Sequence, residues 1–142
     1  MFNPSRDEVR RFFCDTWGKY RRGEALAGLE QTALGVIVAH PEYHDLFEDP
    51  QRASAMEFSP EDGALNPFLH LSLHLAIEEQ LAIDQPPGIQ ARYRELAARM
   101  ASDHDAKHAV LECLGETIWE AQRAGRAPDQ QAYLECLRRR GS

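Results

Sequence analysis

The sequence has few of the features that mark nucleic-acid-binding or membrane proteins. Its 16 Lys and Arg residues are outnumbered by 23 Asp and Glu residues, and the net charge of -7 argues against a nucleic-acid or anionic-membrane partner. No apolar run approaches the ~20 residues that span a bilayer, and the N-terminal residues are charged where a signal peptide would be apolar. We therefore predict a cytoplasmic protein that has no nucleic-acid partner and no membrane partner.

Cysteine and the common catalytic motifs are also scarce. The three cysteines, Cys14, Cys113 and Cys136, are an odd number and have no CxxC spacing. We therefore predict neither a disulfide framework nor a zinc knuckle and expect buried thiols. There is no Gly-rich phosphate loop, HExxH motif or serine nucleophile elbow, so the sequence suggests no organic cofactor and no catalytic residue.

The residues that are present favour helices. Helix formers dominate, and no segment alternates apolar and polar residues as a half-buried strand would. We predict an all-α fold, a compact bundle of about five to seven helices that forms a single domain over residues 1–142. The expected helices cover about 4–22, 24–39, 42–48, 67–84, 89–101, 103–124 and 128–140, and the segment 89–124 is open to being one bent helix. Pro and Gly residues predict an irregular loop or lid over 49–66.

The histidines are the most informative residues. All six fall into pairs four residues apart, and a glutamate follows each pair after four more residues. Six histidines placed at random in a chain of 142 residues would give about 0.2 pairs with this spacing. Because residues i and i+4 share a helix face, two imidazoles and a carboxylate in this register can converge on one point. The three triplets are His40/His44/Glu48, His70/His74/Glu78 and His104/His108/Glu112.

Helical periodicity places these residues against the core. On the helix expected at 67–84, the triplet that begins at His70 falls in the middle of an apolar arc, so we expect it to be buried. His104 and His108 fall at the margin of their apolar stripe. Pro41 excludes His40 from the helix that holds His44, so these two histidines cannot share one helix face. They are therefore weaker candidates, and we expect one of them at most to complete the set of ligands. Buried ionisable groups need partners, and a metal cation is one solution.

Three sequence segments resemble a bacterial family known as domain of unknown function 1841. They are NPFLHLSLHLAIEEQ, HDAKHAVLECLGETIWEAQR and HPEYH, and the likeness extends over nearly the whole chain. The family has no assigned activity, so the resemblance implies a small, mostly helical, cytoplasmic bacterial protein and supplies no catalytic residue. The histidine pattern is also similar to that of hemerythrin-like and DinB-like bundles, in which histidines and carboxylates from several helices hold metal. The hemerythrin order of motifs is not reproduced, because two of its His-to-Glu spacings need Glu at the second position of a pair, where this chain has His.

We therefore predict a helical-bundle protein that binds a transition metal (Fe, Zn or Mn) through buried side chains. The predicted ligands are His70, His74, His104 and His108, with Glu78 and Glu112 as further ligands or as acceptors that fix the imidazole tautomers, and with His40 or His44 closing the site. The alternative is a non-catalytic, acidic interaction protein whose histidines form a metal-free polar network or a homodimer seam. The sequence identifies no small-molecule ligand.

Overall fold

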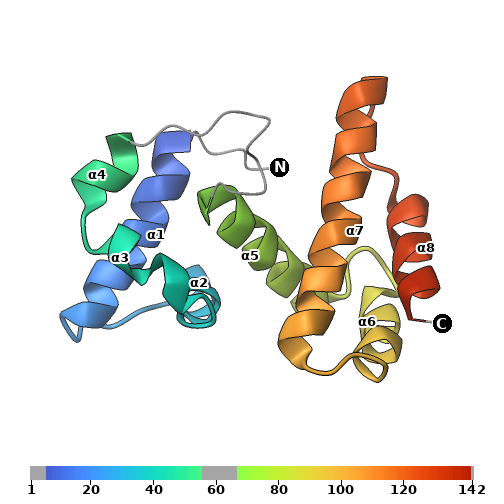
Figure 1. The fold of residues 1–142 in the computed structure, drawn as a ribbon, viewed down its shortest axis with the longest axis horizontal. Coiled ribbons are helices and arrows are strands. Elements are labelled where there is room, and N and C mark those ends of the chain that lie inside the picture. The colour runs from blue at the N-terminus through green and yellow to red at the C-terminus, as the bar shows by residue number, and fades with distance from the viewer. Residues whose placement is uncertain (1–5, 56–66, 142) are drawn as a thin grey trace. The chain divides into compact units, whose positions relative to one another are not determined.

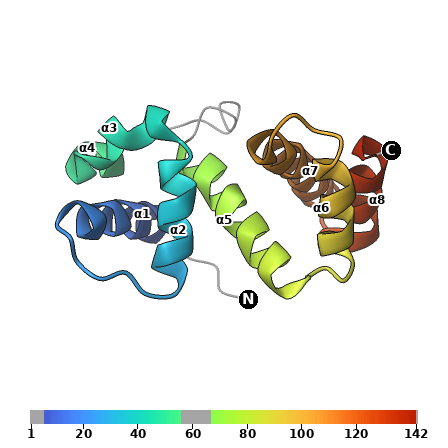
Figure 2. The same ribbon diagram turned by 90° about the horizontal axis from the view of Figure 1, so that it is seen from below.

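The computed structural model describes residues 6–55 and 67–141, and it confirms the all-α prediction (Figures 1 and 2). Within these residues the chain forms eight α-helices and one short 3-10 helix, η1. The elements are α1 (Arg6–Arg21), α2 (Leu29–Val38), η1 (Pro41–Tyr43), α3 (His44–Phe47), α4 (Pro50–Ala55), α5 (Pro67–Ile83), α6 (Ile89–Ala97), α7 (Asp103–Ala124) and α8 (Gln130–Arg140).

The helices belong to two compact units, Met1–Leu75 and Ala76–Ser142, and the boundary between them falls inside α5. In the first unit, α1 packs against α2, α3 and α4. The core of this unit is formed by aromatic and aliphatic side chains from α1, α2, α3 and the first half of α5, among them Phe13, Trp17, Ile37, Phe47 and Leu71. Three helices and a half-helix thus supply one apolar cluster.

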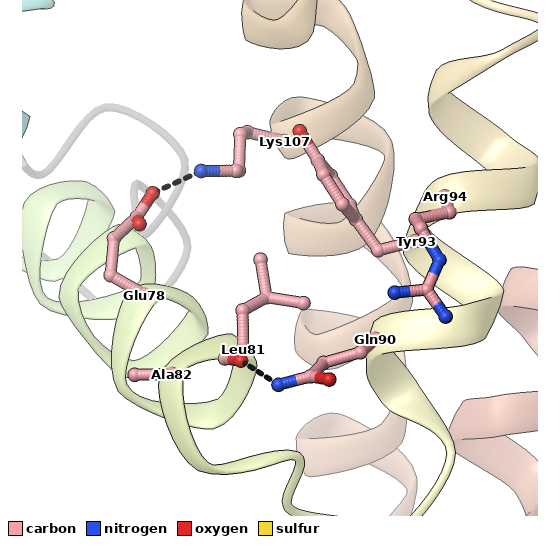
Figure 3. A pocket seen from close by; sticks show the side chains of 7 residues that line it. All are labelled: Glu78, Leu81, Ala82, Gln90, Tyr93, Arg94 and Lys107. Atoms are coloured by element: carbon pink, nitrogen blue, oxygen red, sulfur yellow. Dashed lines mark hydrogen bonds and ion pairs between the residues drawn. The ribbon is translucent and has the colours of Figure 1, made fainter.

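The second unit consists of the last part of α5 together with α6, α7 and α8. Helix α8 packs against both α6 and α7, and Ile89, Leu96, Val110 and Leu137 are fully buried. Polar contacts also join its helices. Lys107 of α7 forms an ion pair with Glu78 of α5 (Figure 3), and the Tyr133 hydroxyl donates to Gln80 Oε1 over 2.7 Å.

A disulfide between Cys113 and Cys136 links α7 to α8. The expectation of buried thiols was therefore wrong for these two residues and is confirmed for Cys14, which is free and buried. The two cysteines are 23 residues apart, and only the packing of α8 on α7 brings their Cα atoms to 5.8 Å. Because this separation depends on tertiary structure, spacing along the sequence could not reveal it.

Several helix boundaries follow from local sequence signals. Helix α5 begins at Pro67, whose fixed φ and missing N–H suit a first helical position. Ser102 caps α7 by accepting from the Asp105 N–H over 3.1 Å, and Gly125 ends α7 in the left-handed conformation. Residues 89–124 therefore form two helices, α6 and α7, and not one bent helix.

Two of the differences from the prediction have a local cause. Helix α2 begins at Leu29 and not near Glu24, because Gly28 takes a positive φ of 55° immediately before it. Residues 50–55 form α4 within the segment that we expected to be irregular. Asp49 accepts from the Arg52 N–H over 3.1 Å, so Asp49 and Pro50 together make a helix start that we did not recognise. The rest of that segment, 56–66, lies outside the described residues.

None of the described helices combines the length and the apolar character that crossing a membrane requires.

Candidate metal centre

His40 occupies the turn between α2 and η1. Pro41 disfavours the α conformation at the residue before it, and His40 takes φ -126° and ψ 65°. In this turn, the His40 Nδ1 lies 2.8 Å from the Val36 carbonyl oxygen. A carbonyl only accepts hydrogen bonds, so the proton of a neutral His40 ring is on Nδ1. The other ring nitrogen, Nε2, then carries the lone pair.

His70 and His74 lie one turn apart on α5 and face His40. The His70 Nε2 and His40 Nε2 atoms are 3.3 Å apart. The ring centroids are 5.0 Å apart for His40 and His70, 4.6 Å for His40 and His74, and 4.8 Å for His70 and His74. One nitrogen from each ring lies within 4.8 Å of the others. We call His40, His70 and His74 the histidine cluster.

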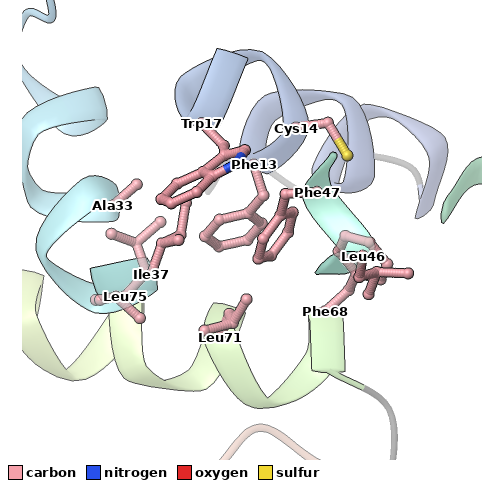
Figure 4. Close-up of a cluster of buried hydrophobic side chains, with 11 residues drawn as sticks. Phe13, Cys14, Trp17, Ala33, Ile37, Leu46, Phe47, Phe68, Leu71 and Leu75 are labelled. Atoms are coloured by element: carbon pink, nitrogen blue, oxygen red, sulfur yellow. The ribbon is translucent and has the colours of Figure 1, made fainter. Parts of the chain in front are cut away.

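Apolar packing in the first unit fixes the spacing between α5, which carries His70 and His74, and α2, which leads into the turn that holds His40. Figure 4 shows Leu71 and Leu75 of α5 pointing towards the part of the core that contains Ile37 of α2. Leu71 and Ile37 are fully buried. The i, i+4 spacing of His70 and His74 places both rings on one face of α5, so core packing brings them against His40.

The histidine cluster is shielded from solvent. His40 and His74 are only 2% and 4% exposed, and His70 is half-buried. The Tyr43 ring stacks on His40 with a centroid separation of 5.8 Å and an interplanar angle of 7°. Burial raises the pKa of the Tyr43 phenol above its ordinary value, with a smaller contribution from Glu42. Our reading of the sequence missed Tyr43 as a neighbour of the site, although its position three residues after His40 was a usable signal.

The geometry of the two Nε2 atoms suits a tetrahedral metal ion. Zinc binds imidazole nitrogen at about 2.0–2.1 Å, and a tetrahedral angle then separates two ligand nitrogens by about 3.3 Å. The observed His40–His70 separation is 3.3 Å. Neutral hydrogen bonds to nitrogen donors are most often about 2.9–3.0 Å long. The His40–His70 pair therefore has the spacing of two ligands around one ion.

His44 does not join the cluster. Its ring packs on Trp17 with centroids 4.4 Å apart, and its Nε2 lies 2.9 Å from the Ile37 carbonyl oxygen. Since a carbonyl requires a donor there, the proton of a neutral His44 ring is on Nε2. Of the two histidines that flank Pro41, His40 is thus the one near His70 and His74.

The glutamate of each triplet has a partner other than histidine. Glu48 accepts from Trp17 Nε1 over 3.0 Å, Glu78 pairs with Lys107, and Glu112 pairs with Arg140. Among the described residues, no carboxylate belongs to the histidine cluster. The glutamates do follow the histidine pairs at a regular spacing in the sequence. In the structure, however, their carboxylates form hydrogen bonds or ion pairs with other side chains.

His104 and His108 lie on α7 in the second unit. Their ring centroids are 4.2 Å apart, and the His108 Nδ1 lies 3.0 Å from the His104 carbonyl oxygen. His104 is exposed and His108 is half-buried. This agrees with their predicted place at the margin of the apolar stripe. A metal-binding role for these two residues and for Glu112 stays a prediction from the sequence.

Comparisons with known proteins add a family but no activity. No curated protein and no solved structure matches the chain. A family model described as "Domain of unknown function (DUF1841)" matches residues 5–139. Because this match covers nearly the whole sequence, the chain belongs to the DUF1841 family.

Proposed function

We propose that this protein binds a transition-metal ion through His40, His70 and His74. The observation that carries the proposal is the 3.3 Å separation between His40 Nε2 and His70 Nε2, together with the Val36 contact that puts the His40 lone pair on Nε2. His74 brings a third imidazole nitrogen within 4.8 Å. Three imidazoles are a common ligand set for catalytic metals in proteins.

The alternative is a metal-free histidine network in a non-catalytic interaction protein. In that case the His70 Nε2–H would donate to His40 Nε2 over 3.3 Å, which is long for such a bond. One shared proton also links only two of the three rings, whereas one cation binds all three. The His40–His70 distance therefore favours the metal site over the network.

The chemistry of the ligands narrows the choice of metal. Imidazole suits zinc, iron, copper and nickel, whereas manganese favours carboxylate and water oxygens. Of the three metals that the sequence suggested, zinc and iron fit a histidine-only set better than manganese. Three protein ligands leave a coordination position for water, and a metal in such a site acts as a Lewis acid and lowers the pKa of that water.

The test is metal analysis of the untagged protein, because a purification tag of histidines would bind metal itself. We expect about one equivalent of zinc or iron per chain and its loss in each of the variants His40→Ala, His70→Ala and His74→Ala. His104→Ala is the matched control, because this exposed histidine lies outside the cluster. Metal-free protein that binds no added zinc would refute the proposal and favour the histidine network.

The control also tests the wider ligand set that the sequence suggested. If His104→Ala or His108→Ala releases the metal as fully as His40→Ala does, the ligands extend beyond the three proposed here. Cytoplasmic location, bacterial origin and a homodimer stay predictions of the sequence alone.

A further inference from the structure

The second unit contains a pocket that combines charged ends with an apolar wall. It has a volume of about 400 Å³ and is lined by residues of α5, α6 and α7, namely Glu78, Leu81, Ala82, Gln90, Tyr93, Arg94 and Lys107 (Figure 3). We call it the α5–α7 pocket. Its volume falls within the range of ordinary small-molecule sites.

One end of the α5–α7 pocket has an excess of negative charge. The Lys107 ammonium pairs with Glu78, lies 3.9 Å from Asp103 Oδ2 and sits 5.4 Å from the centre of the Tyr93 ring. Lys107 is thus neutralised by the protein itself, and the two carboxylates around it leave one net negative charge. The hydroxyl of Tyr93 donates to Asp103. Burial and this contact raise the pKa of Tyr93, which keeps its proton at neutral pH.

The opposite wall carries a positive charge. Figure 3 shows the Arg94 guanidinium on α6, across the pocket from Glu78. Among the described residues, no carboxylate forms an ion pair with Arg94. The neighbouring Gln90 side chain donates its N–H to the Leu81 carbonyl oxygen over 2.7 Å, so its own oxygen stays available as an acceptor. Leu81 and Ala82 form an apolar surface between the charged ends.

We propose that the α5–α7 pocket binds a small amino acid-like zwitterion. The ligand carboxylate pairs with the Arg94 guanidinium, whose planar fork matches a carboxylate in two parallel hydrogen bonds. The ligand ammonium faces Glu78, where the local charge is negative. A short methylene chain between the two groups covers Leu81 and Ala82. The lining residues of this pocket all belong to the second unit, whereas the histidine cluster belongs to the first.

Three probes of equal chain length test the charge pattern. 4-Aminobutanoate carries both charged groups, butanoate carries the carboxylate alone, and butylamine carries the ammonium alone. Each is titrated into the full-length ¹⁵N-labelled protein and followed by amide and side-chain chemical shifts. We expect 4-aminobutanoate to give saturable shifts at Leu81, Gln90 and Arg94, with affinity at least about tenfold above that of either single-charge probe.

Two matched variants locate the binding. Arg94→Gln removes the guanidinium and should weaken 4-aminobutanoate by at least about tenfold. Arg94 is exposed, and therefore the variant should stay folded. Arg99→Gln changes an exposed arginine that does not line the pocket and should bind as the wild type does. The proposal is overturned if no probe saturates, if a single-charge probe binds as tightly as 4-aminobutanoate, or if Arg94→Gln binds unchanged.

Discussion

At the scale of the residue, a backbone contact decides what His40 can do. The Val36 carbonyl oxygen lies 2.8 Å from His40 Nδ1 and thereby directs Nε2 towards His70. The sequence identified the histidines and their faces on the helices. It left open which of His40 and His44 would meet His70, because that depends on the turn at Pro41 and on a carbonyl group that every residue carries. Side-chain identity predicted the candidates, and backbone geometry selected among them.

The variant His40→Asn distinguishes the role of Nδ1, which forms a hydrogen bond, from that of Nε2, which we propose binds the metal. The Asn amide can keep a donor near the position of Nδ1, while nothing replaces Nε2. We expect His40→Asn to lose the metal as His40→Ala does, yet to unfold in urea with chelator at a higher denaturant concentration than His40→Ala. The gain reflects a retained buried hydrogen bond of about 1 kcal/mol. Metal retained by His40→Asn would show that Nε2 is not a ligand.

Cys14 gives a prediction about pH. Burial raises the pKa of its thiol to about 11 from 9.0, and Asp15 adds a smaller effect. The folded protein therefore holds this proton more tightly than the unfolded chain, so stability falls as the pH rises from about 9 to about 11.

The same thiol should resist alkylation in the folded protein at pH 8, because the thiolate is the reactive form. Mass spectrometry after iodoacetamide treatment checks this, and chain unfolded in urea serves as the control. Fast alkylation of Cys14 in the folded protein would contradict its burial.

At the scale of the element, capping and proline signals in the sequence predicted most of the helices. They did not predict the disulfide or the side-chain contacts that join one helix to another. Pro67 marked the start of α5, and Ser102 marked that of α7. These signals lie within a few residues of the boundary and therefore survive without tertiary context. The disulfide and the glutamate partners join residues far apart in sequence, and no local pattern specifies them. The start of α2 was wrong because Gly28 can adopt a positive φ that other residues avoid.

Breaking the Cys113–Cys136 bond should destabilise the second unit by about 3 kcal/mol, because the bond closes a loop of 23 residues in the unfolded chain. Urea unfolding with and without a dithiol reductant measures this difference. The double variant Cys113→Ser/Cys136→Ser should show the lower stability in both conditions. A reductant effect of equal size on the double variant would mean that the reductant acts elsewhere in the protein.

At the scale of the whole molecule, each proposed property resides in one of the two compact units. The histidine cluster belongs to Met1–Leu75, whereas the disulfide and the α5–α7 pocket belong to Ala76–Ser142. Ligand binding stabilises the part of a protein that it contacts, and regions with their own cores can open separately. The two units should therefore respond to different treatments.

Hydrogen exchange should show this separation. We expect added zinc to slow amide exchange in α2 and the first half of α5, and a dithiol reductant to speed exchange in α7 and α8. Mass spectrometry of peptic fragments resolves these segments. A slowing by zinc that is as large in α8 as in α2 would contradict independent units.

The covalent link between α7 and α8 also limits how far the chain can be stretched. Residues between Cys113 and Cys136 are bypassed when the two termini are pulled apart, since tension passes through the sulfur bridge. Because the two cysteines are 23 residues apart and their Cα atoms stay 5.8 Å apart, the oxidised chain reaches a contour length shorter by roughly 75 Å than the reduced chain. In optical tweezers this hidden length appears only after the bridge is cleaved, and the same shortening applies when a motor threads the chain through a narrow pore.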